Sequence, residues 1–463
     1  MIPVLTAEQM RAADAAALDI VDDQEVFIRR AGYCVAVAAK QMLQGAYGRR
    51  VVLIVGKGHN GDDGRVAASW LAQWGAQIRY IDAQDAGEVF IDPRSADLVI
   101  DAAYGIGFRG TWSPPIVMDV PVLAVDIPSG LDATTGTIAG GVLVADRTVT
   151  FAAVKTGMLF GDGPSVCGEI DVVDVGIDPP ADLHTHLVES FDIAHWIPVR
   201  DRGAHKWHHS VRVVAGSPGM AGAASLVSAS AMRAGAGIVH LSWRGDTDSV
   251  LPPTEVVGHV LPREQWAKYL ATDIRRFACL VMGPGLGRGD DIGVEVRAVL
   301  CECDLPTVLD GDGLVAAVDP NGGHSVFLSR TAPTVLTPHD GEFAMLGGDV
   351  SNPDRIAATC ELAEKTQCVV VRKGPTTIVS NPAGDVFLST SGDERLATAG
   401  SGDVLAGVIG ACIARGLDPF LAAAAGAHIH GLAGSSCASE GVIARDVVSV
   451  LGEIMSKLVN DVR

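Results

Sequence analysis

The segment 398–403, Thr-Ala-Gly-Ser-Gly-Asp, has the residue types that phosphoryl transfer needs. An apolar, helix-compatible stretch follows it, so the backbone amides of Gly400, Ser401 and Gly402 are expected at a helix N-terminus, where such amides bind anions. Asp403 comes next and could take a proton from an attacking hydroxyl. Asp is also a favoured N-cap residue, so Asp403 could merely cap the helix. The segment alone leaves both interpretations open.

Carboxylates also follow two strands that we predict in the first half of the chain. Asp101 and Asp126 each end an apolar run of strand-forming residues. The carboxyl ends of neighbouring parallel strands meet at one crevice, so we expect these side chains to converge. Asn60, Asp101 and Ser129 together offer the oxygen ligands that a hard cation prefers.

A glycine pattern at residues 56–61 raises a different possibility. It satisfies G-x-G-x-x-G between a predicted strand, residues 50–55, and a predicted helix, residues 65–74. Asp82 follows about 20 residues later, as in a dinucleotide-binding fingerprint. Taken alone, this pattern favours a dehydrogenase domain, and the alternative stays open at this point.

The composition is typical of a compact α/β protein with two domains. The chain has 463 residues, of which 48% are hydrophobic and 19% charged, and a length above about 150 residues suggests more than one domain. A formal charge of -20 argues against a nucleic-acid or anionic-membrane surface. Nine cysteines without a CxxC pair favour reduced thiols in a cytoplasmic compartment. No signal peptide or membrane span is expected.

The two domains are expected to meet near residues 178–192, which are rich in turn formers. A helix is predicted after Thr6, which forms a capping box with Gln9. In the second half, strands again end in polar or glycine-rich loops, at residues 211–214, 280–282, 307–309, 333–336 and 369–372. Three histidines at 205, 208 and 209 are predicted to belong to a lid or substrate-facing loop, because no matching metal-ligand cluster follows. His428 and His430 are expected to be structural.

The segments at 398–407, 337–342 and 373–377 resemble the ribokinase-like superfamily, in its ADP- or ATP-dependent NAD(P)H-hydrate dehydratase branch. The resemblance implies a C-terminal ribokinase-like α/β domain over residues 191–463, with Asp403 as the catalytic base. It implies substrate contacts at Ala223, Gly285, Gly287, His339 and Asp403. It places the nucleotide at Lys373, Gly374, Pro375, Thr376, Thr377, Gly400, Ser401 and Gly402. No Walker A loop is present, which argues against a P-loop kinase.

Residues 1–190 resemble the NAD(P)H-hydrate epimerase domain, also called the YjeF N-terminal domain, which implies a Rossmann-like three-layer αβα sandwich. In that family the potassium ligands fall on the positions of Asn60, Asp101 and Ser129, and Asp126 is the catalytic carboxylate. Substrate contacts are implied at His59, Asn60, Gly61, Asp62, Asp63, Gly105, Ile106, Gly107, Phe108, Arg109, Gly110 and Asp126. His59 replaces an Asn and Asp62 a Gly of the family's loop.

The two resemblances together imply a bifunctional repair enzyme for hydrated NADH and NADPH (NADHX and NADPHX). The first domain would interconvert the R and S epimers beside K⁺. The second would dehydrate the S epimer with Mg²⁺ and with ADP as the phosphoryl donor, giving AMP and phosphate. A cytoplasmic homo-oligomer is expected from the family. Two alternatives remain: a first domain that only binds nucleotide, as Asp62 suggests, or a ribokinase-like small-molecule kinase.

Overall fold

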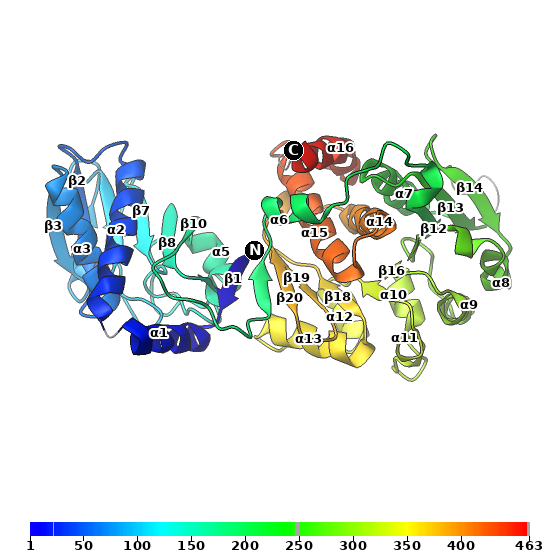
Figure 1. The fold of residues 1–463 in the computed structure, drawn as a ribbon, viewed down its shortest axis with the longest axis horizontal. Helices are drawn as coiled ribbons and strands as arrows, with labels where there is room; N and C mark the ends of the chain where they lie inside the picture. The colour runs from blue at the N-terminus through cyan, green and yellow to red at the C-terminus, as the bar shows by residue number, and fades with distance from the viewer. Residues whose placement is uncertain (22, 246–250, 461–463) are drawn as a thin grey trace. The chain divides into compact units, whose positions relative to one another are not determined.

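The computed structural model of the protein describes residues 1–21, 23–245 and 251–460. The chain divides into two compact units, residues 2–185 and residues 186–463. Each unit has a sheet and a hydrophobic core of its own (Figure 1).

The first unit is built on a six-stranded sheet in the order β10-β8-β7-β5-β2-β3, in which every pair is parallel. Its central strands are continuous apolar runs, as expected for strands buried on both faces. The strands are β2 (Arg50–Val55), β3 (Gln77–Asp82), β5 (Leu98–Ala102), β7 (Val122–Val125), β8 (Arg147–Phe151) and β10 (Glu169–Val173). The short strands β4 (Phe90–Ile91) and β6 (Ile116–Val117) pair with each other, as do β1 (Ile2–Leu5) and β9 (Val154–Lys155).

Helices α2 (Gln24–Met42) and α3 (His59–Gln73) cover one face of this sheet, where their alanines pack on the strands. A second cluster around Trp112 and the 3₁₀ turn η1 (Ala86–Glu88) covers the other face. Helix α1 (Ala7–Val21) begins at the predicted capping box, in which Gln9 N–H donates to Thr6 Oγ1 and Thr6 N–H to Gln9 Oε1. The remaining helices are α4 (Thr156–Leu159) and α5 (Gly163–Val166).

The second unit has a larger sheet in the order β14-β13-β12-β15-β16-β17-β18-β19-β20-β11. The strands from β14 to β18 are parallel, and β18, β19 and β20 form antiparallel pairs. The strands are β11 (Thr185–Leu187), β12 (Ser210–Val214), β13 (Ile238–Arg244), β14 (Val257–Leu261), β15 (Cys279–Met282), β16 (Thr307–Leu309), β17 (Thr334–Leu336), β18 (Val369–Arg372), β19 (Thr377–Ser380) and β20 (Val386–Ser389).

Helices lie on both faces of this sheet and make it the middle of three layers (Figure 1). One core contains α7 (Ala221–Arg233), α14 (Ser401–Ala414), α15 (Pro419–Ser435) and α16 (Ala444–Asn460), with α6 (Ser190–Trp196) beside it. The other contains α8 (Trp266–Ala271), α9 (Asp290–Glu302), α10 (Asp312–Ala317), α11 (Ser325–Leu328), α12 (Asp340–Met345) and α13 (Arg355–Thr366). The 3₁₀ turns are η2 (Lys206–His209), η3 (Ile274–Arg276) and η4 (Glu394–Leu396).

The α/β class is confirmed, and β2 has the bounds of the predicted strand. Two stretches differ from what their sequence predicts. The sequence predicts a helix from Ser225, but α7 begins at Ala221, because the small residues before Ser225 continue the helix. The sequence also predicts a closing strand at residues 155–158, of which all but the first lie in α4. The boundary between the two units, after Thr185, falls within the expected linker, residues 178–192, which also contains β11 and the start of α6.

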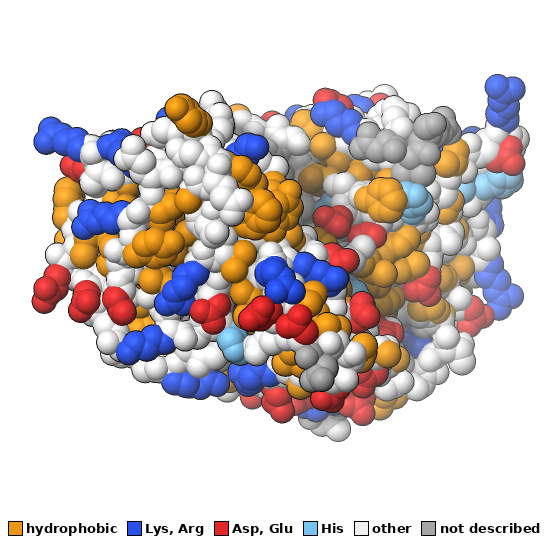
Figure 2. All heavy atoms as spheres, turned by 60° about the vertical axis from the view of Figure 1, so that its left-hand side comes forward, with side chains coloured by type: hydrophobic (Ala, Val, Ile, Leu, Met, Phe, Trp, Pro, Cys, Tyr) orange, Lys and Arg blue, Asp and Glu red, His pale blue; other side chains and the backbone are white. Residues whose placement is uncertain are grey.

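The surface does not concentrate one sign of charge on the face drawn in Figure 2, where acidic and basic side chains are interspersed. None of the nine cysteines forms a disulfide. Among the described residues, no helix is both long and apolar enough to cross a membrane.

Candidate active sites

The first unit contains a cavity of about 930 Å³ beside the carboxyl ends of β2, β5 and β7. The chain order reverses between β2 and β5, and ligands of open parallel sheets bind at such a point. Of the predicted substrate residues, the cavity wall includes His59, Asn60, Asp63, Gly105, Ile106, Gly107, Phe108, Arg109 and Asp126. Gly61, Asp62 and Gly110 are not among its lining residues. Helices α1 and α2 supply a further part of the wall that the sequence did not predict.

Asp126 forms a buried ion pair in this cavity. Its backbone has a positive φ of 66°, and its Oδ1 lies 2.5 Å from the Nζ of Lys155. Lys155 is fully buried and donates further hydrogen bonds to Thr150 Oγ1 (2.8 Å) and to the carbonyl of Phe151 (3.0 Å). A buried ammonium needs such partners, so the lysine holds the carboxylate in place. The sequence analysis missed Lys155, which ends the short strand β9.

The glycine-rich segment after β2 is mostly helical, not the predicted loop. Helix α3 begins at His59 rather than at residue 65. A Cβ at Gly61 would lie 2.2 Å from the carbonyl oxygen of Gly56, and one at Gly64 would lie 2.5 Å from the Cβ of Ala102. These glycines therefore let the helix start directly against the end of the sheet.

The dinucleotide fingerprint is not supported by the geometry. The glycine pattern lies in the start of α3, and Asp82 accepts a hydrogen bond from the backbone of Gln84 (3.0 Å) instead of lining the cavity. Asp62 pairs with Arg65 at 2.9 Å on α3, also away from the cavity wall. Asp62 is the residue that suggested a first unit that only binds nucleotide, and its pairing with Arg65 outside the cavity wall weakens that interpretation.

The three predicted cation ligands are linked through one loop. Ser129 donates to Asp101 from its backbone N–H (2.9 Å) and from its Oγ (2.6 Å), and Tyr104 N–H donates to the same Oγ (2.9 Å). Gly105 lies against Asn60, whose Nδ2 donates to the carbonyl of Val125 (2.6 Å). Burial raises the pKa of Asp101. Asn60 Oδ1 is buried and accepts no hydrogen bond from the described residues. An unpartnered buried oxygen beside a buried carboxylate fits a cation with oxygen ligands.

Two further carboxyl groups share the cavity with Asp126. Burial and the charge of Asp126 raise the pKa of Asp63 to about 8. The same two causes raise the pKa of Asp14, which comes from α1 and was not predicted as a site residue. Carboxyl groups with raised pKa values that share one cavity are typical of acid–base sites.

In the second unit, the segment 398–403 lies at a helix N-terminus as predicted. We call the backbone amides of Gly400, Ser401 and Gly402 the amide nest. Gly400 is the N-cap of α14, with a positive φ of 89°, and Ser401 is the first helical residue. Asp403 is therefore inside the first turn and is not the cap, so the capping alternative is wrong. A Cβ at Gly402 would lie 3.3 Å from the Nζ of Lys373, which places the nest beside that ammonium group.

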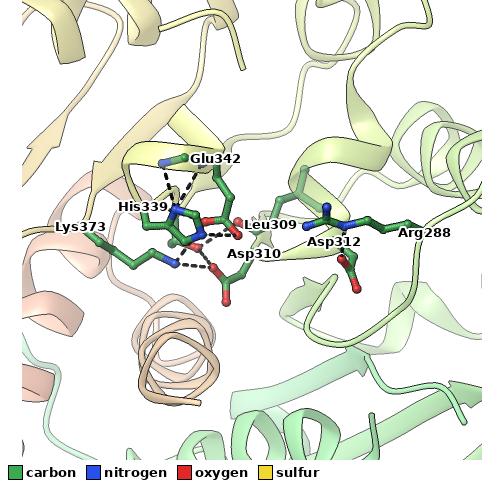
Figure 3. A network of polar contacts seen from close by, with 9 residues as sticks. Arg288, Leu309, Asp310, Asp312, His339, Glu342 and Lys373 are labelled. Carbon is green, nitrogen blue, oxygen red and sulfur yellow. Dashed lines mark hydrogen bonds and ion pairs between the residues drawn. The ribbon is translucent and has the colours of Figure 1, made fainter. Parts of the chain in front are cut away.

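Asp403 faces a cluster of charged residues. Burial, with the charge of Asp310, raises the pKa of Asp403 to about 7, while Lys373 acts in the opposite direction. The Nζ of Lys373 lies 3.0 Å from Asp310 Oδ1 and 3.6 Å from Glu342 Oε2, and Thr337 Oγ1 donates to Asp310 (2.7 Å). Figure 3 shows Lys373, Asp310 and Glu342 pointing toward one another from three separate elements. A carboxyl group that is half protonated near neutral pH suits a general base.

The loops after β12 and β15 meet at the point where the strand order of this sheet reverses. Gly285 has a positive φ of 58° and lies against Ala223. A Cβ built on Gly285 would be 3.0 Å from the Cβ of Ala223. Gly287 N–H and Arg288 Nε both donate to Asp312, each at 2.9 Å. In Figure 3 the pair of Arg288 and Asp312 lies apart from the cluster around Lys373. The structure thus brings the predicted substrate residues Ala223 and Gly285 together.

His339 caps helix α12 and remains accessible. Its Nδ1 accepts hydrogen bonds from Gly341 N–H (3.0 Å) and Glu342 N–H (3.3 Å), and Glu342 Oε2 accepts from His339 N–H (3.0 Å). The side chain is 61% exposed, so it is free to meet a ligand.

The predicted nucleotide segment forms the turn of an antiparallel hairpin. Lys373 directly follows β18 and Thr377 begins β19, so Gly374, Pro375 and Thr376 make the connection. Thr376 is buried. Gly374 lies near Arg355, since a Cβ built on Gly374 would be 3.3 Å from a guanidinium nitrogen of Arg355.

The histidine segment before β12 is not a substrate-facing loop. It forms η2 at the amino end of β12, and His209 Nδ1 lies 3.1 Å from the carbonyl of Ala414, at the end of α14 opposite to the nest. Trp207 packs against Phe277 and beneath the Arg276 guanidinium. The segment therefore packs against its own unit at the end of β12 where no substrate residue is predicted. His428 and His430 on α15 are buried, and burial lowers the pKa of each to about 4.

Comparisons with known proteins agree over nearly the whole chain. Residues 211–456 match the family model of NAD(P)H-hydrate dehydratase, and residues 24–87 and 81–157 match that of the YjeF-related protein N-terminus. The chain is 35% identical to the bifunctional NAD(P)H-hydrate repair enzyme Nnr of Mycobacterium leprae (strain TN), with 93% of each chain covered. It is 30% identical to the enzyme of the same name from Escherichia coli (strain K12), with 92% of this chain and 89% of that protein covered.

Solved structures resemble the second unit. An ADP/ATP-dependent NAD(P)H-hydrate dehydratase from Bacillus subtilis, co-crystallised with ATP and Mg²⁺, is 27% identical with a TM-score of 0.51, and covers 58% of this chain and 97% of its own. A ribokinase-like superfamily protein from Enterococcus faecalis V583 is 21% identical with a TM-score of 0.53, and covers 61% of this chain and 99% of its own. The second likeness supports the ribokinase-like fold.

Proposed function

The chain belongs to the family of bifunctional NAD(P)H-hydrate repair enzymes, and we propose that its two sites divide the two reactions between its two units. The enzyme epimerises the R and S hydrates of NADH and NADPH and dehydrates the S epimer. The first-unit cavity is the epimerase site, and the residues around the N-terminus of α14 form the dehydratase site. The observation that carries the second assignment is Asp403, with its pKa near 7, beside the amide nest and Lys373.

In the epimerase, Asp126 is the group that moves the proton of the hydroxyl on C6. The ammonium of Lys155, 2.5 Å away, orients this carboxylate and offsets its charge. Residues 105–109 and His59 line the same cavity and bind the hydrated nucleotide. Because Asp126 and Lys155 form an ion pair inside the cavity, a first unit that only binds nucleotide is the weaker interpretation.

Asn60, Asp101 and Ser129 would hold K⁺. The buried Asn60 Oδ1 lacks a donor among the described residues, and the Asp101 carboxylate supplies one negative charge, which suits a monovalent ion. A bound K⁺ would attract the anionic part of the substrate and fix the loop at Gly105 beside Asn60.

In the dehydratase, Asp403 takes the proton of the C6 hydroxyl as its oxygen attacks the terminal phosphorus of ADP. The amides of Gly400, Ser401 and Gly402 hold the oxygens of the transferred group, since they lie at the positive end of the α14 dipole. AMP leaves first. Phosphate then leaves from C6 while C5 loses a proton to solvent, and the C5–H electron pair forms the C5–C6 double bond of the dihydronicotinamide. Ala223, Gly285, Gly287 and His339 bind the hydrated nicotinamide, and residues 373–377 bind the adenine nucleotide.

Mg²⁺ would offset the phosphate charge during this transfer. No group of three or more His, Cys, Asp or Glu side chains among the described residues is placed to hold a metal. Mg²⁺ commonly binds through one or two carboxylates, water and substrate phosphates, and the carboxylates of the Lys373 cluster fit that mode. The co-crystallised Bacillus subtilis relative supports this use of nucleotide and Mg²⁺. Free cysteines and the acidic composition support a cytoplasmic location, and we expect a homo-oligomer from the family.

The test follows reduced-nicotinamide absorbance while the enzyme acts on mixed R and S hydrates with ADP, Mg²⁺ and K⁺. The wild type should recover all of the hydrate, in a fast phase for the S epimer and a slower phase for the R epimer. Asp126→Asn should keep the first phase and lose the catalysed part of the second. Asp403→Asn should lose both recovery phases but still equilibrate the epimers, as chromatography of the hydrates would show. An Asp403→Asn variant with full recovery would remove Asp403 from its role.

A further inference from the structure

Helix α1 places one carboxyl group in the wall of the first-unit cavity. Asp14 lines the cavity, as do Met10 and Arg11 from the same helix. Met10 is also buried against the unit, and residues four apart share a helix face, so its burial fixes the turn of α1 that carries Asp14. Asp19 on the same helix is exposed and lies outside the cavity wall.

Asp14 is half-buried. Among the residues that the structure describes, none forms a hydrogen bond or ion pair with its carboxyl group. Burial is the main cause that raises its pKa, and the charge of Asp126 adds to it. Lys155 and His59 act in the opposite direction. Asp14 therefore shares the electrostatic environment of Asp126, although the two come from different walls of the cavity.

Epimerisation at C6 requires two proton transfers. C6 carries the hydroxyl and is bonded to the ring nitrogen N1, so the ring can open if the hydroxyl proton leaves while N1 gains one. Asp126 accounts for only one of these transfers. An enzyme that holds two carboxyl groups in different protonation states can supply both a base and an acid.

We propose that Asp14 is the second catalytic group of the epimerase, the acid that protonates N1 while Asp126 takes the hydroxyl proton. This proposal rests on the epimerase function proposed above. The O–H electron pair forms the C6 carbonyl bond, and the C6–N1 pair goes to N1, which receives the proton of Asp14. Rotation of the freed aldehyde presents its other face. The reverse transfers close the ring with the opposite configuration, return both protons and need no other reactant.

The groups around Asp14 suit this role. Asp126 faces it from the end of β7, Lys155 from β9, and His59 and Asp63 from the start of α3. Lys155 is already paired with Asp126 at 2.5 Å. The buried ammonium of Lys155 thus stabilises Asp126 as the base. Asp14 and Asp63 are carboxyl groups of this cavity with which no cation pairs among the described residues, and Asp14 is the one that α1 brings to the cavity wall.

The decisive experiment is the two-phase assay with Asp14→Asn in the full-length enzyme, and with Asp19→Asn as the matched control on the same helix. Loss of a general acid costs about 10²- to 10⁴-fold. We expect Asp14→Asn to slow the enzyme-catalysed R-epimer phase by at least about 100-fold with a nearly unchanged KM. The S-epimer phase should not change, and Asp19→Asn should leave both phases at wild-type rates.

The pH profile separates an acid from a residue that only binds or supports the fold. An acid works in its protonated form, so the wild-type epimerase kcat/KM should fall as pH rises above the pKa of Asp14. Asp14→Asn should lack this descending limb, and Asp14→Glu should restore part of the rate together with the limb.

An Asp14→Asn enzyme within twofold of the wild type would overturn the proposal, and so would a slow variant that keeps the descending limb or loses only KM. If wild type and Asp126→Asn epimerise equally slowly, the epimerase function itself fails, which is a different result. Equal unfolding temperatures of Asp14→Asn and Asp19→Asn exclude a folding defect.

Discussion

Each unit uses a lysine with little or no exposed surface to hold a carboxylate that directly follows a strand. In the first unit Lys155 pairs with Asp126, and in the second Lys373 pairs with Asp310. A buried charge without a partner is costly, so these pairs fix the side chains around which each site is built. No cation pairs with Asp403 in this way among the residues that the structure describes, and burial raises the pKa of its carboxyl group to about 7.

The pH dependence of the dehydratase should report Asp403. A base acts in its ionised form, and the pKa of Asp403 is raised to about 7. The dehydratase kcat/KM should therefore fall tenfold per pH unit as pH drops below about 7. Initial rates on S hydrate from about pH 5.5 to about pH 8.5 check this expectation. A flat profile across pH 7 would contradict a role for Asp403 as the base of the free enzyme.

At the scale of elements, α3 shows how glycines can support a helix start. Glycine in a helix interior is ordinarily unfavourable, and it led the sequence analysis to predict a loop up to residue 64. The helix instead begins at His59 because Gly61 and Gly64 allow its first turns to touch the carboxyl ends of β2 and β5. That contact places Asn60 and Asp63 at the cavity.

Two alanine substitutions test this account. Gly61→Ala would bring a Cβ within 2.2 Å of the Gly56 carbonyl oxygen, whereas a Cβ at Gly58 meets nothing within 4 Å. Overpacking costs about 1–3 kcal/mol, so Gly61→Ala should lower the unfolding temperature of the first unit by several degrees and reduce epimerisation. Gly58→Ala, the matched control, should lower the temperature by less, because it creates no close contact and only replaces the N-cap glycine of α3. Equal unfolding temperatures of the two variants would argue against the close contact.

At the scale of the whole molecule, two units with separate cores should unfold separately. A ligand that binds only the folded form raises its stability by RT ln(1 + [L]/Kd), about 2.7 kcal/mol at a hundredfold excess over Kd. In calorimetry, ADP with Mg²⁺ should therefore raise the temperature of one unfolding transition, that of residues 186–463. Gly61→Ala should lower the temperature of the other transition, that of residues 2–185. A single transition that both changes shift together would contradict independent units.

The sequence by itself determined the fold class, the order of the strands along the chain and most of the polar segments at their ends. These features are local: continuous apolar runs predict buried parallel strands, and a small-residue loop before a helix predicts an amide nest. The motif resemblances added the family, which the comparisons confirm. The roles of individual site residues stay predictions.

Only the tertiary structure decided which side chains meet. Lys155 is 29 residues from Asp126, and Lys373 is 63 residues from Asp310, so no local pattern marks either pair. Asp14 reaches the cavity because α1 lies along its wall, which the helical pattern alone does not reveal. Burial and the neighbouring charges set the pKa values of Asp63 and Asp403. The burial and the neighbouring charges arise from long-range packing. The pKa of a carboxyl group depends on the groups that surround it in space, which the neighbouring residues in the sequence do not reveal.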